Sequence, residues 1–131
     1  LMTCAGQFYD LLKTGGGSLI IISSTAAFHA TVGNPGYNAS KAGAAGLTRT
    51  LGKAWAPDGI RVNGIAPGLI ATKMTRVTTD NPKRREATIE SIPMGRIGDP
   101  DDMAGLALFL ASPLANYIVG QTIIADGGLL L

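Results

Sequence analysis

Two side chains four positions apart could share one site of proton transfer. Tyr37 and Lys41 are separated by three residues, and residues four apart on a helix stand on the same face about one turn from each other. A phenol with a pKa of about 10 is a poor base at neutral pH, but an adjacent ammonium stabilises the phenolate and lowers that pKa. The pair therefore indicates a general acid and base, although surface Tyr and Lys also occur at this spacing by chance.

A hydroxyl at the end of an apolar run is a third candidate. Residues 18–24 read Ser-Leu-Ile-Ile-Ile-Ser-Ser, and such a short β-branched run is typical of a strand covered on both faces. Ser24 lies at the carboxyl end of that strand, thirteen residues before Tyr37. The strand must therefore present Ser24 to the helix that carries Tyr37 and Lys41.

The rest of the sequence alternates between helical and extended patterns. A helix over 37–56 is dense in Ala and Leu and is stopped by Pro57-Asp58-Gly59, and a second strand over 60–66 is closed by Pro67-Gly68, which cannot continue a central ladder. A capping Asp99 followed by Pro100 predicts a helix running to about Ser112. The other expected elements are helices over 1–13 and 82–91, an irregular Thr-rich segment over 69–79, and a strand over 121–125.

Strands that alternate with helices imply right-handed crossovers. We expect an α/β fold, a doubly wound parallel sheet with helices on both faces. Ligands bind beyond the carboxyl ends of the strands in such sheets. Because Ser24 and Pro67-Gly68 both lie at those ends, two distant segments should meet at one site.

Composition excludes several classes of protein. The chain has 131 residues, of which 46% are hydrophobic and 15% charged, and this balance fits one globular domain. Its net charge of +2 gives no indication of a nucleic-acid partner. It has neither an apolar run of roughly 18 residues nor a signal-peptide pattern, so we expect a soluble, cytoplasmic protein without a membrane segment. Cys4, the only cysteine, is expected to be a small buried residue, and no metal site is predicted.

Other motifs favour structural roles. The three glycines at 15–17 precede a strand instead of joining a strand to a helix, so they predict a turn and not a phosphate-binding loop. A Ser-His-Asp hydrolase is not supported, because the chain has only one histidine, His29, and lacks the Gly-x-Ser-x-Gly motif that carries the nucleophile in many hydrolases. His29 is expected to line a substrate loop or to lie in solvent.

Taken together, the motifs resemble the classical branch of the short-chain dehydrogenase/reductase family. The resemblance covers essentially the whole chain and implies a Rossmann-type sheet. The motifs that carry it are Gly17-Ser18, Ser24, Tyr37-x-x-x-Lys41, Ile60-Arg61-Val62-Asn63, Pro67-Gly68, Pro93-Met94-Gly95-Arg96, Gly120-Gln121 and Asp126-Gly127-Gly128.

The resemblance implies an NAD- or NADP-dependent oxidoreductase acting on a small alcohol or carbonyl substrate such as a sugar, a steroid or an acyl thioester. Tyr37 would be the general acid and base, and Ser24 would hydrogen-bond the substrate oxygen. Lys41 would lower the pKa of Tyr37 and bind the ribose of the nicotinamide. Ser23 is not expected to take part. Hydride transfer would belong to the cofactor.

A second segment is implied to close over the nicotinamide. In the segment from Pro67 and Gly68 onward, the backbone at Ile70 would hold the carboxamide. Thr72 would contact the carboxamide or the phosphates, although an ordinary Thr after a turn is the plainer interpretation. The Thr-rich residues that follow would form a lid over the substrate.

The resemblance also implies what should lie outside the sequence. The family's Gly-rich turn, its residue that separates NAD from NADP and its catalytic Asn would all precede Leu1, so we expect residues 1–131 to be the C-terminal half of a single Rossmann-fold domain. The small residues Ala39, Ala42, Gly43 and Gly46 would allow a homodimer or homotetramer in the full-length protein. Three rival interpretations remain: an isolated chain without activity, a non-catalytic binding or scaffold member of the family, and an unrelated doubly wound domain that binds a phosphate-bearing effector.

Overall fold

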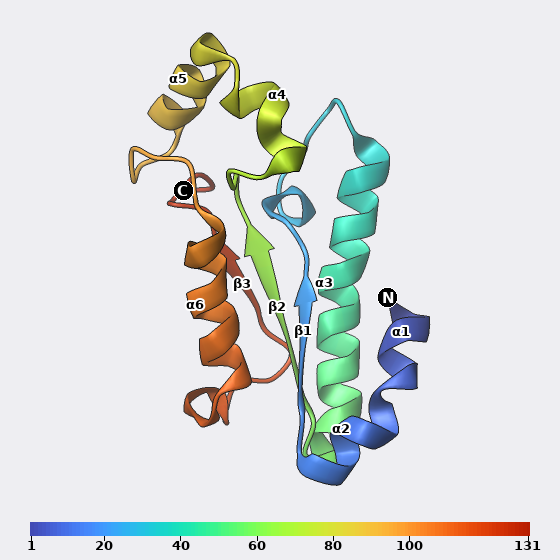
Figure 1. Cartoon of the computed structure of the whole chain (residues 1–131). Coiled ribbons are helices and arrows are strands. Elements are labelled where there is room, and N and C mark those ends of the chain that lie inside the picture. The colour runs from blue at the N-terminus through green and yellow to red at the C-terminus, as the bar shows by residue number, and fades with distance from the viewer.

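One parallel sheet of three strands forms the centre of the molecule, and the computed structural model describes all 131 residues (Figure 1). The strands are β1 (Ser18–Ile22), β2 (Arg61–Pro67) and β3 (Thr122–Ala125), in the order β1-β2-β3. Both pairings are parallel, with Ile22 opposite Ile65 and Pro67 opposite Ala125. The predicted α/β fold is confirmed. Pro67 is the last residue of β2 and does not stop the strand before it, because the ladder continues through the N–H of Gly68, which donates to Ala125.

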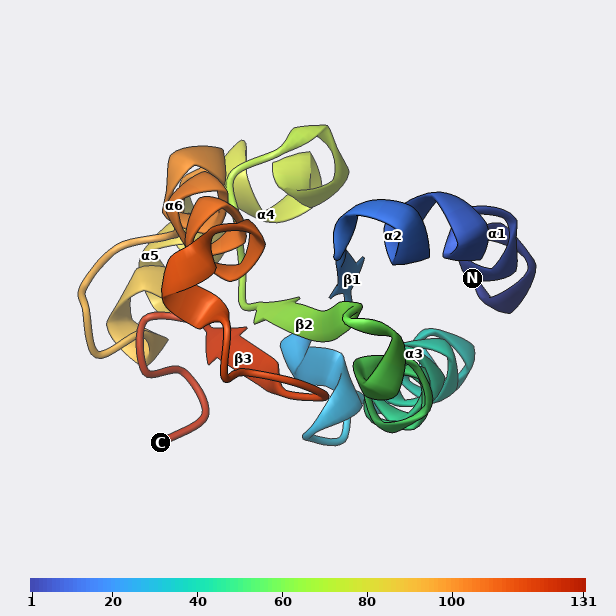
Figure 2. The same ribbon diagram turned by 90° about the horizontal axis from the view of Figure 1, so that it is seen from below.

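Helices cover both faces of the sheet (Figures 1 and 2). On one face lie α1 (Met2–Gln7), α2 (Tyr9–Gly15) and the long α3 (Pro35–Trp55). The side chains that form the core on this face are Ala5, Ile21, Ala44, Leu51, Ile60 and Val62. On the other face α6 (Pro100–Ala111) packs through Leu110 against Ile65 of β2. The sheet is therefore doubly wound, as the sequence predicts.

Arg61 at the start of β2 ties the sheet to the end of α6. Its guanidinium donates to four carbonyls beyond or within the last turn of that helix: Leu110 at 2.6 Å, Ala111 at 3.2 Å, Ser112 at 3.3 Å and Ala115 at 3.4 Å. The last carbonyls of a helix have no partners within the helix. A planar guanidinium with five donors can serve several of them at once, so Arg61 caps α6 from the neighbouring strand.

The two helices that flank the site, α3 and α6, begin with side-chain caps. The side chain of Asn34 accepts from the N–H of Tyr37 at 3.2 Å, and Pro35 occupies the first turn, so α3 begins two residues before its predicted start. At α6 the carboxylate of Asp99 accepts from the N–H of Asp101, as expected from the sequence, and the helix ends at Ala111. These caps fix where the two helices that flank the site begin.

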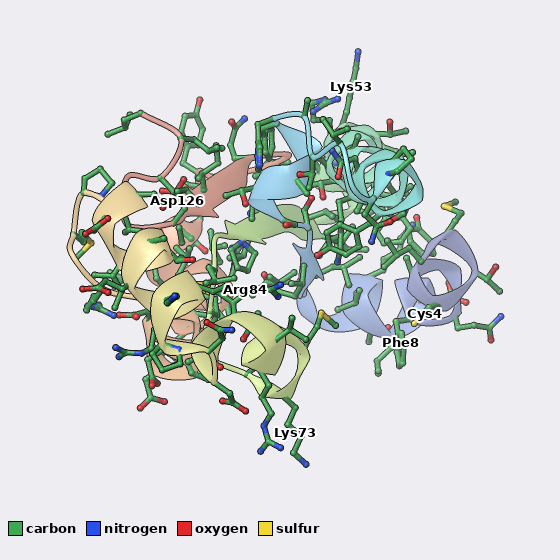
Figure 3. All side chains as sticks on the ribbon, turned by 90° about the horizontal axis from the view of Figure 1, so that it is seen from above. Cys4, Phe8, Lys53, Lys73, Arg84 and Asp126 are labelled. Atoms are coloured by element: carbon green, nitrogen blue, oxygen red, sulfur yellow. The ribbon has the colours of Figure 1, made fainter.

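The N-terminal segment differs from its prediction. The single helix expected over 1–13 is wrong: α1 and α2 are separated at Phe8, which leaves the regular helical conformation with φ −97° and ψ −3°. Cys4 is exposed, contrary to the expected burial, because only Ala5 of α1 is buried. Cys4 and Phe8 both lie on the outer part of this segment (Figure 3).

The segment after β2 contains more helix than its Thr-rich sequence predicts. Residues 69–79 were expected to be irregular, but they include a 3-10 turn, η3 (Lys73–Thr75), and the short helix α4 (Arg76–Thr79). The helix α5 (Pro82–Ser91) has the predicted bounds. This excursion lies beyond the carboxyl ends of the strands, with Lys73 pointing outward (Figures 1 and 3). No helix in the chain combines the length and the apolarity that crossing a bilayer requires.

Candidate active site

The two serines that follow β1 have different partners. Ser23 is 3% exposed, and its hydroxyl donates to the carbonyl of Lys41 in α3 at 2.8 Å. Ser24 is half-buried, and its Oγ accepts from the N–H of Ala26 at 3.2 Å, which caps the 3-10 turn η1 (Thr25–Ala27). Because Ser24 is only an acceptor in that contact, its hydroxyl proton remains free to be donated to a ligand.

The first turns of α3 carry the phenol and the ammonium. Lys41 Nζ lies 5.6 Å from the centre of the Tyr37 ring and donates to the carbonyl of Ile22 at 3.2 Å. The Ile22 carbonyl belongs to the last residue of β1, so one cation joins the end of the strand to the face of the phenol. Tyr37 is 36% exposed, which leaves its ring open to a ligand.

The end of β2 needs a glycine. A Cβ on Gly68 would lie 2.6 Å from the Cβ of Asp126 and 2.8 Å from its Cα, both too close for a real side chain. The N–H of Gly68 donates to the carbonyl of Ala125 at 3.0 Å. Gly68 therefore lets the chain leave the sheet directly against the end of β3.

The next residues form a short bridge with the segment before α6. Ile70 pairs in parallel with Gly98: the N–H of Gly98 donates to Leu69 at 3.0 Å, and the N–H of Ala71 donates to Gly98 at 2.8 Å. The N–H of Ile70 donates to no acceptor in the protein. Thr72, two residues further on, is exposed. An unpaired donor and a hydroxyl therefore stand close together in the chain.

One cavity of about 380 Å³ is lined by every residue that was predicted to take part in catalysis or in cofactor binding. The predicted residues that line it are Ser24, Tyr37, Lys41, Pro67, Gly68, Ile70 and Thr72. They come from the ends of β1 and β2 and from the start of α3, as expected for the carboxyl edge of a parallel sheet. Ser23 also touches the cavity, although its hydroxyl is used within the protein.

Five further residues line the cavity and were not singled out from the sequence; one of them, Ile22, is the last residue of β1. Met74 and Thr75 come from η3, and Pro100 and Met103 come from the start of α6. Met74 and Thr75 belong to the Thr-rich segment that was predicted to form a lid over the substrate, although neither residue was named. Met103 could not, because a lone apolar residue on a helix is indistinguishable from a core residue in sequence.

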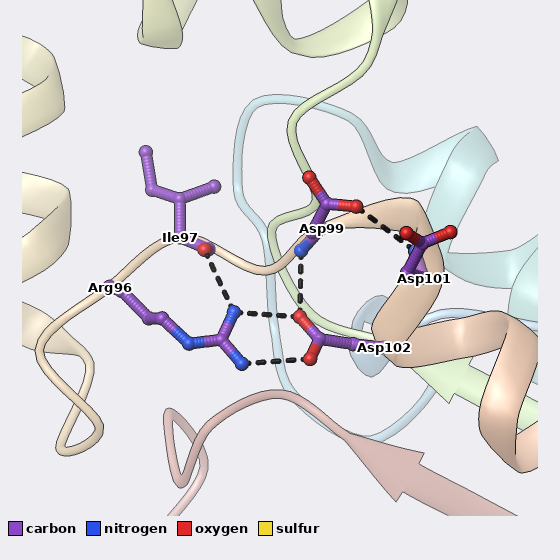
Figure 4. A network of polar contacts seen from close by, with 5 residues as sticks. All are labelled: Arg96, Ile97, Asp99, Asp101 and Asp102. Carbon is purple, nitrogen blue, oxygen red and sulfur yellow. Dashed lines mark hydrogen bonds and ion pairs between the residues drawn. The ribbon is translucent and has the colours of Figure 1, made fainter.

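An ion pair holds the segment that carries Gly98. Arg96 donates to both carboxylate oxygens of Asp102 at 2.7 Å, and the Asp99 N–H donates to the same carboxylate at 2.8 Å (Figure 4). These hydrogen bonds, that of Arg96 first, hold the pKa of the Asp102 carboxyl well below its usual range. Such charge-assisted, bidentate contacts fix the loop before α6 on both sides of Gly98.

His29 is not part of this cavity. Its Nδ1 lies 2.9 Å from the carbonyl of Thr25, and the residue is exposed. No group of three or more His, Cys, Asp or Glu side chains is arranged to hold a metal ion.

Comparisons with known proteins find relatives along the whole chain. A family model described as "Enoyl-(Acyl carrier protein) reductase" matches residues 1–130. The chain is 44% identical over 127 residues to the 3-oxoacyl-(acyl-carrier-protein) reductase FabG of Chlamydia pneumoniae, covering 97% of the chain and 50% of the relative. It is 44% identical over 118 residues to the 2-dehydro-3-deoxy-D-gluconate 5-dehydrogenase of Bacillus subtilis, covering 90% and 46%. The chain thus spans about half the length of these relatives.

A solved structure has the same fold. An NADP-bound structure from Agrobacterium tumefaciens, described as a candidate 2-deoxy-D-gluconate 3-dehydrogenase, superimposes with a TM-score of 0.90 at 41% sequence identity. The match covers 96% of this chain and 52% of that structure.

Proposed function

The chain belongs to the short-chain dehydrogenase/reductase family, and on that premise we propose that the full-length protein is an NAD- or NADP-dependent oxidoreductase that interconverts an alcohol and a carbonyl. The observation that carries the proposal is the cavity in which Ser24, Tyr37 and Lys41 meet from two separate elements. A phenol, an ammonium and a hydroxyl are the groups that a proton-coupled reduction of a carbonyl requires.

The residues around Ile70 fit the carboxamide of a nicotinamide. A carboxamide presents one carbonyl acceptor and one amino donor. The unpaired N–H of Ile70 could donate to the carbonyl, and the Thr72 hydroxyl could accept from the amino group. Several relatives of this fold are described with bound NADP or NADH, which supports the same class of cofactor here.

The chain's own residues would handle the proton. When bound, the nicotinamide supplies a hydride to a carbonyl carbon or takes one from an alcohol carbon. During reduction Tyr37 would donate its phenolic proton to the substrate oxygen, and during oxidation it would take that proton back. The ammonium of Lys41, 5.6 Å from the Tyr37 ring centre, would stabilise the phenolate.

Ser24 would orient the substrate oxygen. Its free hydroxyl proton can be donated to that oxygen, and the N–H of Ala26 fixes the position of its Oγ at 3.2 Å. A donor that is already in place when negative charge develops lowers the barrier without reorganisation. Ser23 would act on the site only indirectly, through the Lys41 carbonyl.

We also propose that residues 1–131 are the C-terminal half of a single Rossmann-fold domain. β1 pairs with β2 on one side only, and Ile22 at its end is 51% exposed. An open edge on a doubly wound parallel sheet can accept further strands. The relatives are about twice as long as this chain, which provides the length for those strands.

A homodimer or homotetramer is the expected assembly of the full-length protein. Ala39 and Gly43 of α3 are exposed, and a Cβ on Gly43 would meet no atom within 4 Å. A helix face with such small side chains allows a second backbone to approach closely. The face supports the proposal, and the mass of the full-length protein in solution tests it.

Turnover by the full-length protein tests the function. NADH, NADPH and their oxidised forms would be assayed with sugar acids, hydroxysteroids and 3-oxoacyl thioesters, beside Tyr37→Phe and the matched control Tyr117→Phe, whose ring is fully exposed on another part of the surface. We expect turnover that falls by about 10³-fold in Tyr37→Phe, within the usual range for loss of a general acid, and is unchanged in the control.

Other results would favour the rival functions. Equal turnover in wild type and Tyr37→Phe would contradict the mechanism. Cofactor binding without turnover of any substrate would favour a binding or scaffold protein. Failure to bind either cofactor would contradict the family function for this member and favour a domain that binds another ligand.

A further inference from the structure

One hydroxyl organises the backbone that faces the proposed nicotinamide site. Thr75 Oγ donates to the carbonyl of Ile70 at 2.6 Å and accepts from the N–H of Thr72 at 2.9 Å. Thr75 lies in η3, outside the segment it contacts, and it is half-buried in the cavity wall. A single side chain therefore fixes both residues that would hold the carboxamide.

The bridge to Gly98 determines which way the backbone of Ile70 points. Gly98 bonds the Leu69 carbonyl and the Ala71 N–H. In an extended segment the N–H and carbonyl of one residue point opposite to those of its neighbours, so the N–H and carbonyl of Ile70 point away from Gly98. On the side away from Gly98, the Thr75 hydroxyl donates to the Ile70 carbonyl, and the Ile70 N–H has no partner.

The loop that carries Gly98 is held in place by contacts that do not involve Thr75. Gly98 lies between Arg96 and Asp99, both of which bond the carboxylate of Asp102 at the start of α6 (Figure 4). The segment 69–72 is therefore held from one side by the loop before α6 and from the other side by Thr75. Removal of the Thr75 hydroxyl would leave the Ile70 carbonyl without its donor, whereas the bond from the Thr75 N–H to the Thr72 carbonyl and the bridge to Gly98 would remain.

We propose that Thr75 is a positioning residue for the nicotinamide: by occupying the Ile70 carbonyl it leaves one donor, the Ile70 N–H, and one hydroxyl, that of Thr72, to face the carboxamide. This inference rests on the proposed function. With the Ile70 carbonyl unoccupied, the same stretch would offer a second acceptor, and the carboxamide could bind in a flipped orientation. Thr75 thus selects one orientation of the ring and touches the cofactor only through its neighbours.

The test compares whole and partial cofactors on the full-length protein. Thr75→Val keeps the shape of the side chain and removes the hydroxyl, whereas Thr75→Ser keeps the hydroxyl. Thr79→Val is the matched control, because the Thr79 hydroxyl contacts only the neighbouring Asp80. Dissociation constants would be measured for whichever of NADH and NADPH wild type binds more tightly, and for the matching ADP-ribose, which lacks the nicotinamide.

We expect Thr75→Val to weaken binding of the reduced cofactor by about tenfold, the effect of losing one hydrogen bond and leaving its carbonyl unpaired. Binding of ADP-ribose should be unchanged, and Thr75→Ser and Thr79→Val should bind like wild type. Unchanged cofactor affinity in Thr75→Val would overturn the inference while the proposed function stands. Equal losses for cofactor and ADP-ribose would also overturn it, because Thr75 would then support the fold in general. Wild type that binds neither cofactor would instead overturn the proposed function and the inference with it.

Discussion

The ammonium of Lys41 lies over the ring of Tyr37, 5.6 Å from its centre. Both residues belong to α3, so their distance is set by one helical turn. The same ammonium donates to the Ile22 carbonyl at the end of β1. The proposed proton-transfer pair therefore lies within one helix, and its ammonium also contacts the last residue of β1.

Replacement of Lys41 should separate catalysis from folding. Lys41→Met removes the charge beside the phenol, and we expect kcat/KM to fall by about 10²-fold or more, since stabilisation of the phenolate is lost. Lys53→Met on the same helix, whose side chain is exposed, should leave kcat/KM unchanged. Steady-state kinetics of both variants check this. An equal loss of kcat/KM in both variants would mean that the substitutions disturb the helix and would contradict a specific role for Lys41.

The two adjacent serines should respond in opposite ways. Ser24→Ala should lower kcat by about 10²-fold, as loss of a preorganised donor does, with a small change in stability. Ser23→Ala should destabilise the protein by about 1 kcal/mol, the usual cost of a buried hydrogen bond, and lower kcat less. Denaturant unfolding and kinetics on both variants measure the contrast, and the reverse pattern would exchange the proposed roles.

Loss of the Arg61 guanidinium should loosen α6. Arg61→Met removes four hydrogen bonds to carbonyls at and beyond the end of that helix and leaves the Ala111 carbonyl without a partner, so we expect a loss of about 2–3 kcal/mol. Arg61→Lys should recover only part of this loss, since a single ammonium cannot span the same carbonyls. Thermal unfolding would rank the stabilities of wild type, Arg61→Lys and Arg61→Met in that order. An Arg61→Lys variant as stable as wild type would contradict the prediction.

Two glycines in helices should have opposite effects when replaced by alanine. A Cβ on Gly52 would lie 2.7 Å from the Cα of Gly120 and 2.8 Å from its N, so Gly52→Ala should cost about 1–3 kcal/mol even after the gain in helix propensity. Gly105 of α6 has no atom within 4 Å of that position, and Gly105→Ala should stabilise the protein by about 0.5–1 kcal/mol. Equal effects in denaturant unfolding would show that the close approach to Gly120 has relaxed.

Stability should fall on acidification through two carboxyls. The pKa of Asp102 is lowered by Arg96, and that of Asp58 by Lys13 and then by Tyr9. Since the folded chain binds these protons more weakly than the unfolded chain, their contribution is complete above the ordinary Asp pKa of about 4 and is lost as pH falls toward the lowered values.

A neutral variant checks that pH dependence. Asp102→Asn should reduce the difference in melting temperature between about pH 7 and about pH 3, values on either side of the ordinary Asp pKa. Asp10→Asn, at an exposed carboxylate without an ion pair, should keep the wild-type difference. An undiminished difference in Asp102→Asn would remove this carboxyl as a source of the effect.

The fold and the meeting of the strand ends could be predicted from simple geometry, whereas Ile70 and Thr72 were predicted only from the resemblance to the family. Parallel strands end at one edge of a sheet, so Ser24 and Gly68 had to meet there once their segments were identified as neighbouring strands. The helix α3 was predicted to begin at Tyr37, two residues late. Its true start could have been predicted, because Asn34 followed by Pro35 is the pattern of a capping residue and a first-turn proline.

The features that could not be predicted depend mostly on contacts between distant parts of the chain. The break at Phe8 and the exposure of Cys4 follow from how little of α1 reaches the core, which no local pattern reports. The short helices after Thr72 are too brief for a period in the sequence. The roles of Ser23 and Thr75 appear only once their partners in space, Lys41 and Ile70, are known.

The apolar middle of β1 has a consequence for how the chain finds its alignment. Ile20 and Ile21 pack on opposite faces, so a slide of β1 by one residue would still place an apolar side chain on both, yet it would move one of Ser23 and Ser24 into the place of the other. Contacts at the start of the strand oppose this slide: a Cβ at Gly17 would clash with the side chain of Leu12, and Ser18 Oγ donates to the Leu110 carbonyl at 3.2 Å. Two chemically identical neighbours thus differ in their contacts, and in the roles proposed for them, because the start of their strand sets its register.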